Sequence, residues 1–517
     1  MARVSFITLY DKGCLGTRYL SSFLKRAGHS ADIIYLGRHE GRVMDKKETA
    51  KSCDDLWIGI NEYGAELVRS YSDPIQDKEI ALLIDLLVRR KPDIVAFSLR
   101  TMFLNTARRI TESIRSRLKV PVIYGVIAPT CQPERCIQYA DMICLGEGEL
   151  SMLKLVEALD NGRDLQDVGN IWFKQGQDIY RNPVLPLEQD LDSLPFPDYA
   201  AENKFAIRDC RLIENDPAIG NMSRFTYEVM TSRGCPFACS YCCNDLLRSL
   251  YPKQSFLRRR SVANVIDELK AAKERHNIRS VLFRDEVFTF DLDWIKEFSA
   301  RYKREVNLPF WCNTHPSLVN EEILKILKSD GMFSITMGIQ SGSENVLFNV
   351  FNRRTPGEKI INAAKILKKL DLPDNPRFDM ITDNPFETED DCRQTLELLM
   401  RLPKPVNFGL TKLSFIPGTK IAKVPLEQAP GWNMSVKARL FWNLLYLLNQ
   451  YMFFPNALII FLSKRSFLKH NPYLLYVFLL PKFLEIKFQE LSGKIKKGLP
   501  PGVVLVLKRV RYRLKGY

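Results

Sequence analysis

The sequence predicts an α/β protein with two parallel β-sheets, followed by a mostly helical C-terminal region. Two series of short apolar segments, each alternating with helical stretches, indicate this class, because strands that alternate with helices form parallel sheets. From about residue 426 the composition becomes apolar and aromatic. We therefore expect a doubly wound, Rossmann-like domain, a connector, a parallel barrel and a helical region at residues 1–150, 151–220, 221–425 and 426–517.

The overall composition limits the class of protein. The 517 residues are 46% apolar and 26% charged, which is typical of folded globular domains. Twelve cysteines are too few for a disulfide scaffold of this length. The segment MARVSFITLY lacks the apolar core and cleavage site of a signal peptide. We therefore place the chain in the reducing cytosol, where clustered cysteines bind metal or catalyse rather than pair.

The first series of strand-like segments begins with ARVSFITLY at residues 2–10. A glycine-containing turn, an amphipathic helix that stops at Gly28 and a second strand follow. Three further segments, at 92–100, 120–129 and 140–149, end in small or polar residues. Ligands of doubly wound sheets bind at the carboxyl ends of such strands. No G-x-G-x-x-G follows the first strand, so an ordinary dinucleotide site is not indicated.

The cysteines of SRGCPFACSYCCN, residues 232–244, form the most informative motif. Cys235, Cys239 and Cys242 stand as C-x3-C-x2-C, and Cys243 follows directly. A zinc site normally takes four ligands from paired motifs, and no second pair lies nearby. Three thiolates suit a [4Fe–4S] cluster with one iron left open for an exchangeable ligand. The iron–sulfur interpretation is therefore favoured over zinc.

The second series of strands follows this motif. It comprises a strand at Phe225–Met230 and later segments at 280–290, 309–317, 333–343, 377–388 and 408–419. The segments end in polar residues such as Asp285 and Glu286, and parallel barrels place their chemistry at those strand ends. His315 also ends a segment, where we expect an ordinary polar loop residue.

Over about residues 221–420, these motifs resemble the radical S-adenosylmethionine superfamily. That family carries C-x3-C-x2-C after the first strand of a partial (β/α)6 barrel, and the phrases GIQSGS, DNPFET and PGT are also similar to it. The resemblance implies that Cys235, Cys239 and Cys242 ligate a [4Fe–4S] cluster whose open iron binds S-adenosylmethionine. The family cleaves this cofactor reductively to methionine and a 5′-deoxyadenosyl radical, which abstracts hydrogen from unactivated carbon.

The same resemblance implies the contacts to S-adenosylmethionine. Tyr241 precedes the last cysteine and is expected near the adenine. Gln340 and Ser341, within GIQSGS, are expected to touch the cofactor. The family often has Glu where Gln340 stands.

Residues 1–150 resemble the cobalamin-binding domain of this superfamily's largest branch, and LDSLPFPDY at 191–199 resembles its connector. The D-x-H-x2-G motif is absent, so no histidine is offered as a lower cobalt ligand, and we expect His29 and His39 on the surface. Many members of the branch bind cobalamin without histidine ligation, through loops that follow the strands. The alternative is a domain that keeps the fold without the cofactor. The residues implied in cobalamin binding are Gly13, Cys14, Gly16, Ser98, Leu99, Thr101, Gly125 and Gly146.

The C-terminal region combines apolar segments with a basic tail. None of the apolar segments reaches the ~20 residues of a membrane-spanning helix. The net charge of the chain is +15, and Lys and Arg are frequent from Lys482 to Tyr517. Two interpretations stay open: a peripheral anchor at the inner face of the membrane, and a helical subdomain that caps the barrel. No nucleic-acid-binding module is present.

Three functions follow from the resemblance. The first is a cobalamin-dependent radical C-methyltransferase. The second is a cobalamin-dependent radical oxidative cyclase or oxidoreductase without methyl transfer, and the third is a non-catalytic sensor of cluster and cobalamin. The expected partners are a small-molecule substrate, with a lipid-like molecule among the candidates, and a one-electron donor such as flavodoxin or ferredoxin. Neither a G-x-S-x-G elbow nor a P-loop appears, so hydrolase and ATPase chemistry are not indicated.

Overall fold

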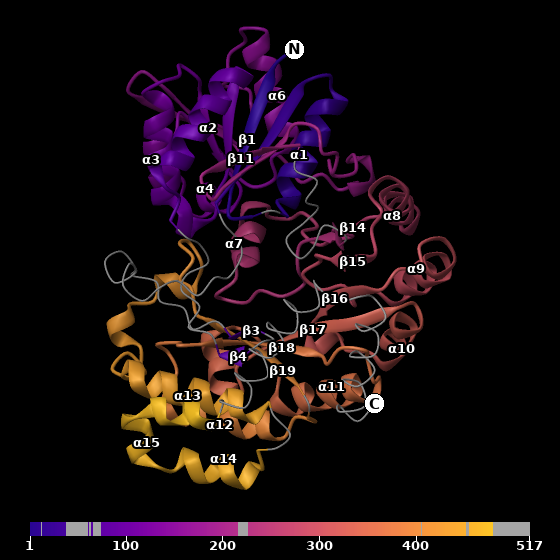
Figure 1. The fold of residues 1–517 in the computed structure, drawn as a ribbon, viewed down its shortest axis with the longest axis vertical. Coiled ribbons are helices and arrows are strands. Elements are labelled where there is room, and N and C mark those ends of the chain that lie inside the picture. The colour runs from indigo at the N-terminus through magenta and orange to yellow at the C-terminus, as the bar shows by residue number, and fades with distance from the viewer. Residues whose placement is uncertain are drawn as a thin grey trace, which may run out of the picture.

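The protein contains two sheets with helices packed against both (Figure 1). The α/β class predicted from the sequence is confirmed. His39 and the basic tail at 482–517 lie outside the described residues, as does the expected first residue of the strand at 225–230. The computed structural model describes residues 1–11, 13–37, 60–61, 64–65, 74–215, 226–404, 406–450 and 454–478.

The first sheet has the strand order β11-β10-β2-β1-β5-β6-β7-β8-β9. Its five central strands are parallel, as expected of a doubly wound sheet. They are nearly uniformly apolar and buried because helices cover both faces. The strands are β1 (Arg3–Leu9), β2 (Ser30–Leu36), β5 (Ile94–Ser98), β6 (Val122–Gly125) and β7 (Met142–Cys144). The helices are α1 (Leu15–Arg26), α2 (Asp77–Arg90), α3 (Leu104–Arg115), α4 (Ile127–Cys131), α5 (Pro133–Tyr139) and α6 (Glu149–Asp160).

The segment expected as a connector also widens the first sheet. A hairpin joins the edge at β7, and a second pair joins the edge at β2, where its inner strand runs parallel to β2. Asp198, within the connector, accepts a 2.6 Å hydrogen bond from the Ser21 hydroxyl and ion pairs with Lys25 and Lys204. The added strands are β8 (Ile171–Gln175), β9 (Asp178–Arg181), β10 (Lys204–Arg208) and β11 (Arg211–Glu214).

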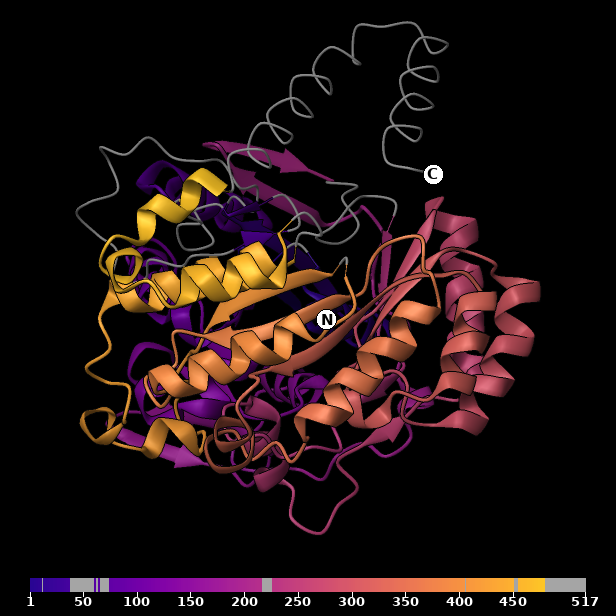
Figure 2. The same ribbon diagram turned by 90° about the horizontal axis from the view of Figure 1, so that it is seen from below.

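The second sheet contains six parallel strands in sequence order, with two short antiparallel strands, β3 (Ile60–Asn61) and β4 (Gly64–Ala65), beyond β19. Figure 2 shows the helices along its outer side. The parallel strands are β12 (Thr226–Val229), β15 (Ser280–Phe283), β16 (Phe310–Thr314), β17 (Met332–Gln340), β18 (Arg377–Thr382) and β19 (Asn407–Lys412). The helices are α8 (Val262–His276), α9 (Leu292–Glu305), α10 (Glu321–Ser329), α11 (Gly357–Lys369) and α12 (Glu389–Met400).

Local sequence signals set the ends of several helices. Thr388 and Asp391 form a reciprocal capping box at the start of α12. Ser261 caps α8 in the same way, with its hydroxyl accepting from the backbone N–H three residues on. Gly28, which follows α1, has φ +87, a conformation that glycine adopts without steric cost.

The C-terminal region is helical, and its first helix caps the barrel. α13 (Val436–Asn449) is buried over most of its length and contributes to the same apolar core as the second sheet. The Tyr446 hydroxyl donates a 3.0 Å hydrogen bond to the Cys392 carbonyl of α12. The remaining elements are α14 (Asn456–Ser463), α15 (Ser466–His470) and η8 (Pro472–Leu475). Within the described ranges, no helix is long and apolar enough to cross a membrane.

A buried ionic network joins the two sheets. Arg233, after β12, pairs with Glu147 at 3.1 Å and with Glu149 at 2.6 Å, both beyond β7. Arg258 pairs with Glu147 as well, at 2.5 Å. Glu147 N–H also donates to the Tyr251 hydroxyl at 3.1 Å. The carboxyl end of the first sheet is therefore held against the loop that follows β12.

Candidate active site

The three cysteines of the C-x3-C-x2-C motif lie on one loop. It runs from β13 (Ser232–Arg233), which pairs with β14 (Arg258–Arg259), to α7 (Cys243–Leu250). Cys239 is buried, and Cys235 and Cys242 are half-buried. Burial raises the pKa of Cys235 to about 11, and both other thiols add to that shift, so the three sulfur atoms share one neighbourhood. A bound metal reverses such a shift, since it ionises its thiol ligands.

Cys242 also caps α7. Its sulfur accepts from Asn244 N–H at 3.5 Å and from the Asn244 amide at 3.7 Å. A thiolate there gains from the positive end of the helix dipole. The neighbouring Cys243 thiol hydrogen-bonds to Cys242 and raises its pKa.

A segment far along the sequence holds this loop in place. Residues 350–353, which we call the brace, follow a π-helix, η5 (Val346–Val350), that begins shortly after β17. Ser240 donates to the Phe351 carbonyl from its N–H at 2.9 Å and to the Val350 carbonyl from its hydroxyl at 2.5 Å. The Asn352 amide donates to the Ala238 carbonyl at 2.8 Å. The cysteine loop is thus fixed by a segment from elsewhere in the sequence. π-Helical turns are frequent at functional sites.

Two further contacts complete the support of the loop. Arg248 of α7 donates to the carbonyls of Cys235 and Phe237. Ile421 N–H donates to the Ser240 carbonyl at 3.1 Å. The sequence motif gave no indication of these contacts, because they come from segments that only the folded chain brings near.

Arg353 is the residue of the brace that reaches the cysteines. Its Nη1 lies 3.8 Å from the Cys239 sulfur, and its Nη2 donates to the Gly338 carbonyl at 2.5 Å. Its buried Nε has no hydrogen-bond partner in the described part of the chain. Sequence reasoning missed Arg353; the only available signal was its place soon after GIQSGS.

Gln340 lies beside Arg353 at the end of β17. Its φ is +73, which is strained for a residue other than glycine. Its side chain folds back over Gly338, where an added Cβ would lie 2.5 Å from Gln340 Nε2. Strain of this kind is found at ligand sites. Tyr241, the other predicted cofactor contact, meets the Phe351 ring edge-on with centroids 4.9 Å apart.

Ser341 points away from the cysteines. Its side chain is fully buried, and its hydroxyl donates to the Glu387 carboxyl at 3.2 Å. Gly342 N–H and the Ser343 hydroxyl donate to Thr395 at 3.0 Å and Asp391 at 2.5 Å of α12. The structure therefore gives Ser341 a supporting contact that anchors the turn after Gln340.

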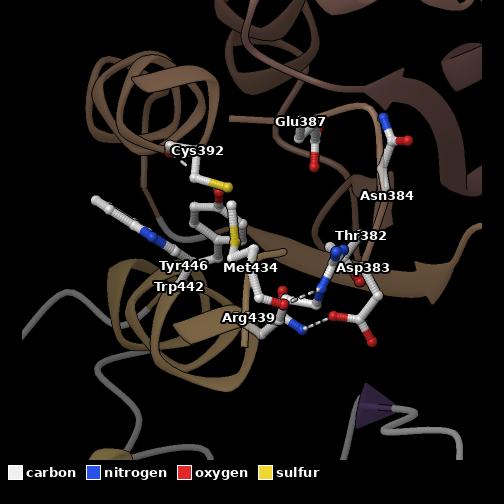
Figure 3. A pocket seen from close by; sticks show the side chains of 10 residues that line it. Thr382, Asp383, Asn384, Glu387, Cys392, Met434, Arg439, Trp442 and Tyr446 are labelled. Carbon is white, nitrogen blue, oxygen red and sulfur yellow. Dashed lines mark hydrogen bonds between the residues drawn. The ribbon is translucent and has the colours of Figure 1, made fainter. Parts of the chain in front are cut away.

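Glu387 belongs to a small pocket between β18, α12 and α13, where it and Cys392 approach the same space (Figure 3). Burial raises the pKa of the Glu387 carboxyl to about 8, so the group is mostly neutral at pH 7. Asp383 on the opposite side accepts a 3.0 Å hydrogen bond from Asn443 of α13. Glu387 thus links the turn after β17 to the C-terminal cap.

His315 is buried against the cysteine loop, which corrects the expectation of an ordinary loop residue. Its ring stacks on Phe237 with centroids 3.6 Å apart. Ser317 N–H donates to Nδ1 at 3.0 Å, so the proton resides on Nε2, which has no partner among the described residues. Burial, with Arg353 and Lys359 nearby, lowers the pKa of His315 to about 2 and keeps the ring neutral.

The two acids after β15 have different environments. Asp285 is buried and accepts from Thr231 Oγ1 at 2.7 Å and from Ser232 Oγ at 2.5 Å. Glu286 is exposed, yet removal from bulk water raises its pKa, and its charge acts on Cys235 and Cys242. Its carboxyl therefore lies near the cysteine loop.

At the carboxyl edge of the first sheet, the predicted cobalamin residues occupy the loops after β1, β5, β6 and β7. Cys14 and Leu99 are buried, whereas Gly16 is exposed with open space around its Cα. Met102 and Val126 expose 48% and 43% of their surface on this edge. Val126 has φ +73, a conformation normally reserved for glycine. The edge thus offers open apolar surface and strained loops. Of the predicted residues, Ser98 and Gly125 end β5 and β6, and Gly16 lies in the first turn of α1, while the segments that follow the strands contain Gly13, Cys14, Leu99, Thr101 and Gly146.

Two residues at the first sheet have other surroundings. The side of Gly146 where a Cβ would stand is filled by the Tyr251 hydroxyl, so this glycine serves the contact between the sheets. His29 lies at the opposite end of the sheet, where its Nδ1 accepts from Ala2 N–H at 3.3 Å. It is therefore remote from the strand ends that would face a corrinoid.

A family model for the radical S-adenosylmethionine superfamily matches residues 229–399, which include the cysteine loop, Glu286, Gln340 and the brace. Residues 229–399 therefore form a radical S-adenosylmethionine domain. The resemblance stated from the sequence is thereby confirmed.

Two curated relatives cover about two thirds of the chain. An uncharacterized methyltransferase of Pyrococcus horikoshii is 28% identical over 66% of this chain and 70% of its own length. Cytidylyl-2-hydroxyethylphosphonate methyltransferase of Streptomyces wedmorensis is 25% identical over 69% and 67%. The solved structure of the radical S-adenosylmethionine methyltransferase TsrM from Kitasatospora setae, with cobalamin and a [4Fe–4S] cluster bound, covers 81% of this chain and 77% of its own, with a TM-score of 0.60. At 16% identity, TsrM shows likeness of fold alone.

The residues around the cysteine loop suit the family's cluster and cofactor. In the described ranges, no three His, Cys, Asp or Glu side chains converge on one point for a single ion. A cubane does not need that convergence, because each cysteine binds a different iron. The orphaned donors Arg353 Nε and His315 Nε2 are buried without partners, which is costly unless a ligand supplies an acceptor.

Proposed function

We propose that the chain is a cobalamin-dependent radical S-adenosylmethionine methyltransferase that methylates carbon. The observation that supports this most is the placement of the two strand-end edges. The Arg233–Glu147–Arg258 network holds the loops after β7 against the cysteine loop. A corrinoid on the first edge would then lie next to S-adenosylmethionine on the second, as transfer of a methyl group to a nearby substrate carbon requires.

In this proposal Cys235, Cys239 and Cys242 hold the [4Fe–4S] cluster. Together with bound S-adenosylmethionine, the cluster supplies one-electron cleavage of that cofactor. Tyr241 lies beside the adenine and Gln340 beside the methionine portion, while Ser341 supports the turn. The chain's own contribution is orientation: the brace fixes the loop, and buried Arg353 and His315 offer donors to acceptor groups.

Residues 1–150 form the cobalamin-binding domain, 151–220 the connector, 221–425 the barrel and 426–517 the C-terminal region. Cobalamin binds without a histidine ligand, against the exposed apolar surface of Met102 and Val126. The predicted cobalamin-binding residues are retained in this proposal, except that Gly146 serves mainly the contact with Tyr251. Methyl transfer is favoured over the oxidative alternative because the two curated relatives that cover about two thirds of the chain are named as methyltransferases.

The substrate is a small molecule that presents a hydrogen-bond donor or a cationic group. Glu286 is an exposed carboxyl group beside the cysteine loop. It accepts a hydrogen bond from the Asn244 side chain, and no cation among the described residues contributes to its pKa. Such a group binds donors on a substrate more readily than the fully bonded Asp285. A reducing cytoplasm with a flavodoxin- or ferredoxin-type donor completes the proposal.

The test is anaerobic reconstitution of the full chain with iron, sulfide and hydroxocobalamin, followed by desalting. We expect about four irons per chain, retained corrinoid absorption bands, and 5′-deoxyadenosine on addition of dithionite and S-adenosylmethionine. Methyl-labelled S-adenosylmethionine then tests for label on a protein-bound corrinoid. Four irons and deoxyadenosine without retained corrinoid would favour the oxidative alternative. Zinc in place of iron, with no deoxyadenosine, would overturn the proposal.

A further inference from the structure

The outer side of the C-terminal helical layer is unusually apolar. Its inner residues Ile459, Leu462 and Leu475 are buried in the barrel core. The outward residues, which we call the outer apolar face, belong to α14, α15 and η8 and the turn that follows. They are Ile460 (39% exposed), Phe461 (51%), Phe467 (66%), Tyr473 (60%), Leu474 (45%) and Val477 (60%).

This concentration sets the face apart from the rest of the described surface. Elsewhere on the described surface, the exposed large apolar residues come in smaller numbers, such as Val88 on α2 and the pair Met102 and Val126 on the first edge. Scattered exposed apolar residues are normal, whereas a contiguous group marks an interaction site. α15 and η8 contact each other, and both contact α13, so the group occupies one layer.

The charges around the face are all positive. Lys464 and Arg465 are exposed at its edge, and the Arg465 guanidinium lies 3.9 Å from the centre of the Phe461 ring. No Asp or Glu occurs between Glu427 and Glu485. Among the described residues, an acid reaches this segment from another helix, where Glu389 of α12 pairs with Lys469.

We propose that the outer apolar face docks on an anionic lipid surface. Aromatic and aliphatic side chains flanked by Lys and Arg are the elements of an interfacial binding site, where apolar groups enter the headgroup region and cations meet anionic lipids. A second copy of the chain would bring the same cations together, and the basic segment after 478 would do likewise, so neither complements this face in charge. The inference is independent of the proposed methyl transfer.

The experiment measures how the full-length protein partitions onto lipid vesicles. One set contains phosphatidylcholine alone, and the other also contains about 30% phosphatidylglycerol, which makes the surface anionic. We expect binding to the anionic vesicles only. Phe467→Ser with Val477→Ser should weaken it on the order of 30-fold, since each change removes an apolar group from the interface. The control, Val88→Ser with Leu159→Ser, removes two partly exposed apolar groups elsewhere and should change binding less than about twofold.

A charge variant keeps the test decisive if the apolar variant misfolds. Lys464→Glu with Arg465→Glu should weaken anionic binding on the order of 10-fold and make it less dependent on salt. Iron content and thermal unfolding report whether each variant is folded. Unchanged partition of both variants would assign any binding to the basic tail and overturn the proposal. Two other results would also overturn the proposal: no binding of the wild-type protein to anionic vesicles, and concentration-dependent dimerization that the apolar variant abolishes.

Discussion

The two strand-end edges of the molecule are built in opposite ways. In the barrel, contacts between the cysteine loop and the brace fix the loop. They involve Ser240 of the loop and Asn352 and Arg353 of the brace. On the first sheet, Met102 and Val126 are exposed. One edge is organised by internal hydrogen bonds before any ligand binds, while the other presents a broad open surface.

This difference matches the demands of the two proposed ligands. A cluster needs cysteines at fixed positions, so the loop must resist movement. A large, flat corrinoid held without a histidine ligand gains mainly from apolar contact area. We therefore expect substitutions in the barrel to have discrete, large effects, and substitutions on the first edge to have graded effects.

The largest effect is expected from Cys239→Ala. Cys239 is the buried cysteine of the three, and its loss removes one of three cluster ligands. We expect iron per chain to fall to near background and 5′-deoxyadenosine formation to become undetectable, with corrinoid retention preserved. Iron analysis, absorption spectra and product chromatography measure these quantities.

Cys243→Ala is the matched control, because this thiol adjoins Cys242 but lies outside the C-x3-C-x2-C spacing. It should retain iron and activity within about twofold. Equal loss of iron in both variants would mean that the wrong cysteines have been assigned.

Arg353→Gln should have the next largest effect. Removing a cation 3.8 Å from the Cys239 sulfur disfavours the more negative, reduced cluster. We expect iron to be retained and the midpoint potential to fall, on the order of 50 mV. Arg354→Gln is the control, because Arg354 is the exposed neighbour. Equal shifts in both variants, measured by redox titration, would contradict a specific role.

The sequence predicted the cysteine loop and most barrel strands well, because both depend on short-range patterns. The expected segment 333–343, for example, contains most of β17, which ends at Gln340. The brace could not be predicted, since Ser240 and Phe351 are far apart in sequence and meet only through the fold. Ser341 was assigned to the cofactor by motif, but the motif does not reveal that its hydroxyl faces Glu387.

The first domain shows the same limit. Five parallel strands followed from the apolar pattern, whereas the added strands β8 to β11 did not, because the connector lacks a strong alternating pattern. Gly146 was expected to bind cobalamin because it lies in a loop that follows a strand of the first sheet. Its close contact with Tyr251 depends on the packing between the two sheets, which no local pattern encodes.

Ionisation of Glu387 is expected to make the stability of the protein depend on pH. Its folded-state pKa, about 8, lies above the ordinary glutamate value of 4.5, so the folded protein binds the extra proton between these values. Stability should therefore decrease as pH rises through that window. Glu387→Gln removes the ionisation, and we expect it to unfold at a higher temperature than wild type at pH 8.5 but not at pH 4.5, with a free-energy difference of about 1–3 kcal/mol. Glu397→Gln, an exposed change on α12, is the control; a pH dependence that persists in Glu387→Gln would refute the assignment.

The smallest effect concerns backbone strain on the first edge. Val126 and Gln340 both have φ +73, one on each edge. Val126→Gly should raise the free energy of unfolding by about 1 kcal/mol, because relief of strain exceeds the added entropy of glycine. Calorimetry measures this change in the free energy of unfolding. The comparison variant is Ile127→Gly, at the start of α4, which should lower that free energy by a similar amount.

Gln340→Gly sharpens the comparison between the edges. It relieves the same strain but removes a side chain proposed to touch S-adenosylmethionine, so stability should rise while affinity for that cofactor falls. Val126→Gly removes only apolar surface and should weaken corrinoid binding by less than about tenfold, in line with the loss of a few methyl groups. If Val126→Gly instead abolished corrinoid retention, the strained loop itself would be the binding element, and the first edge would be as preorganised as the barrel.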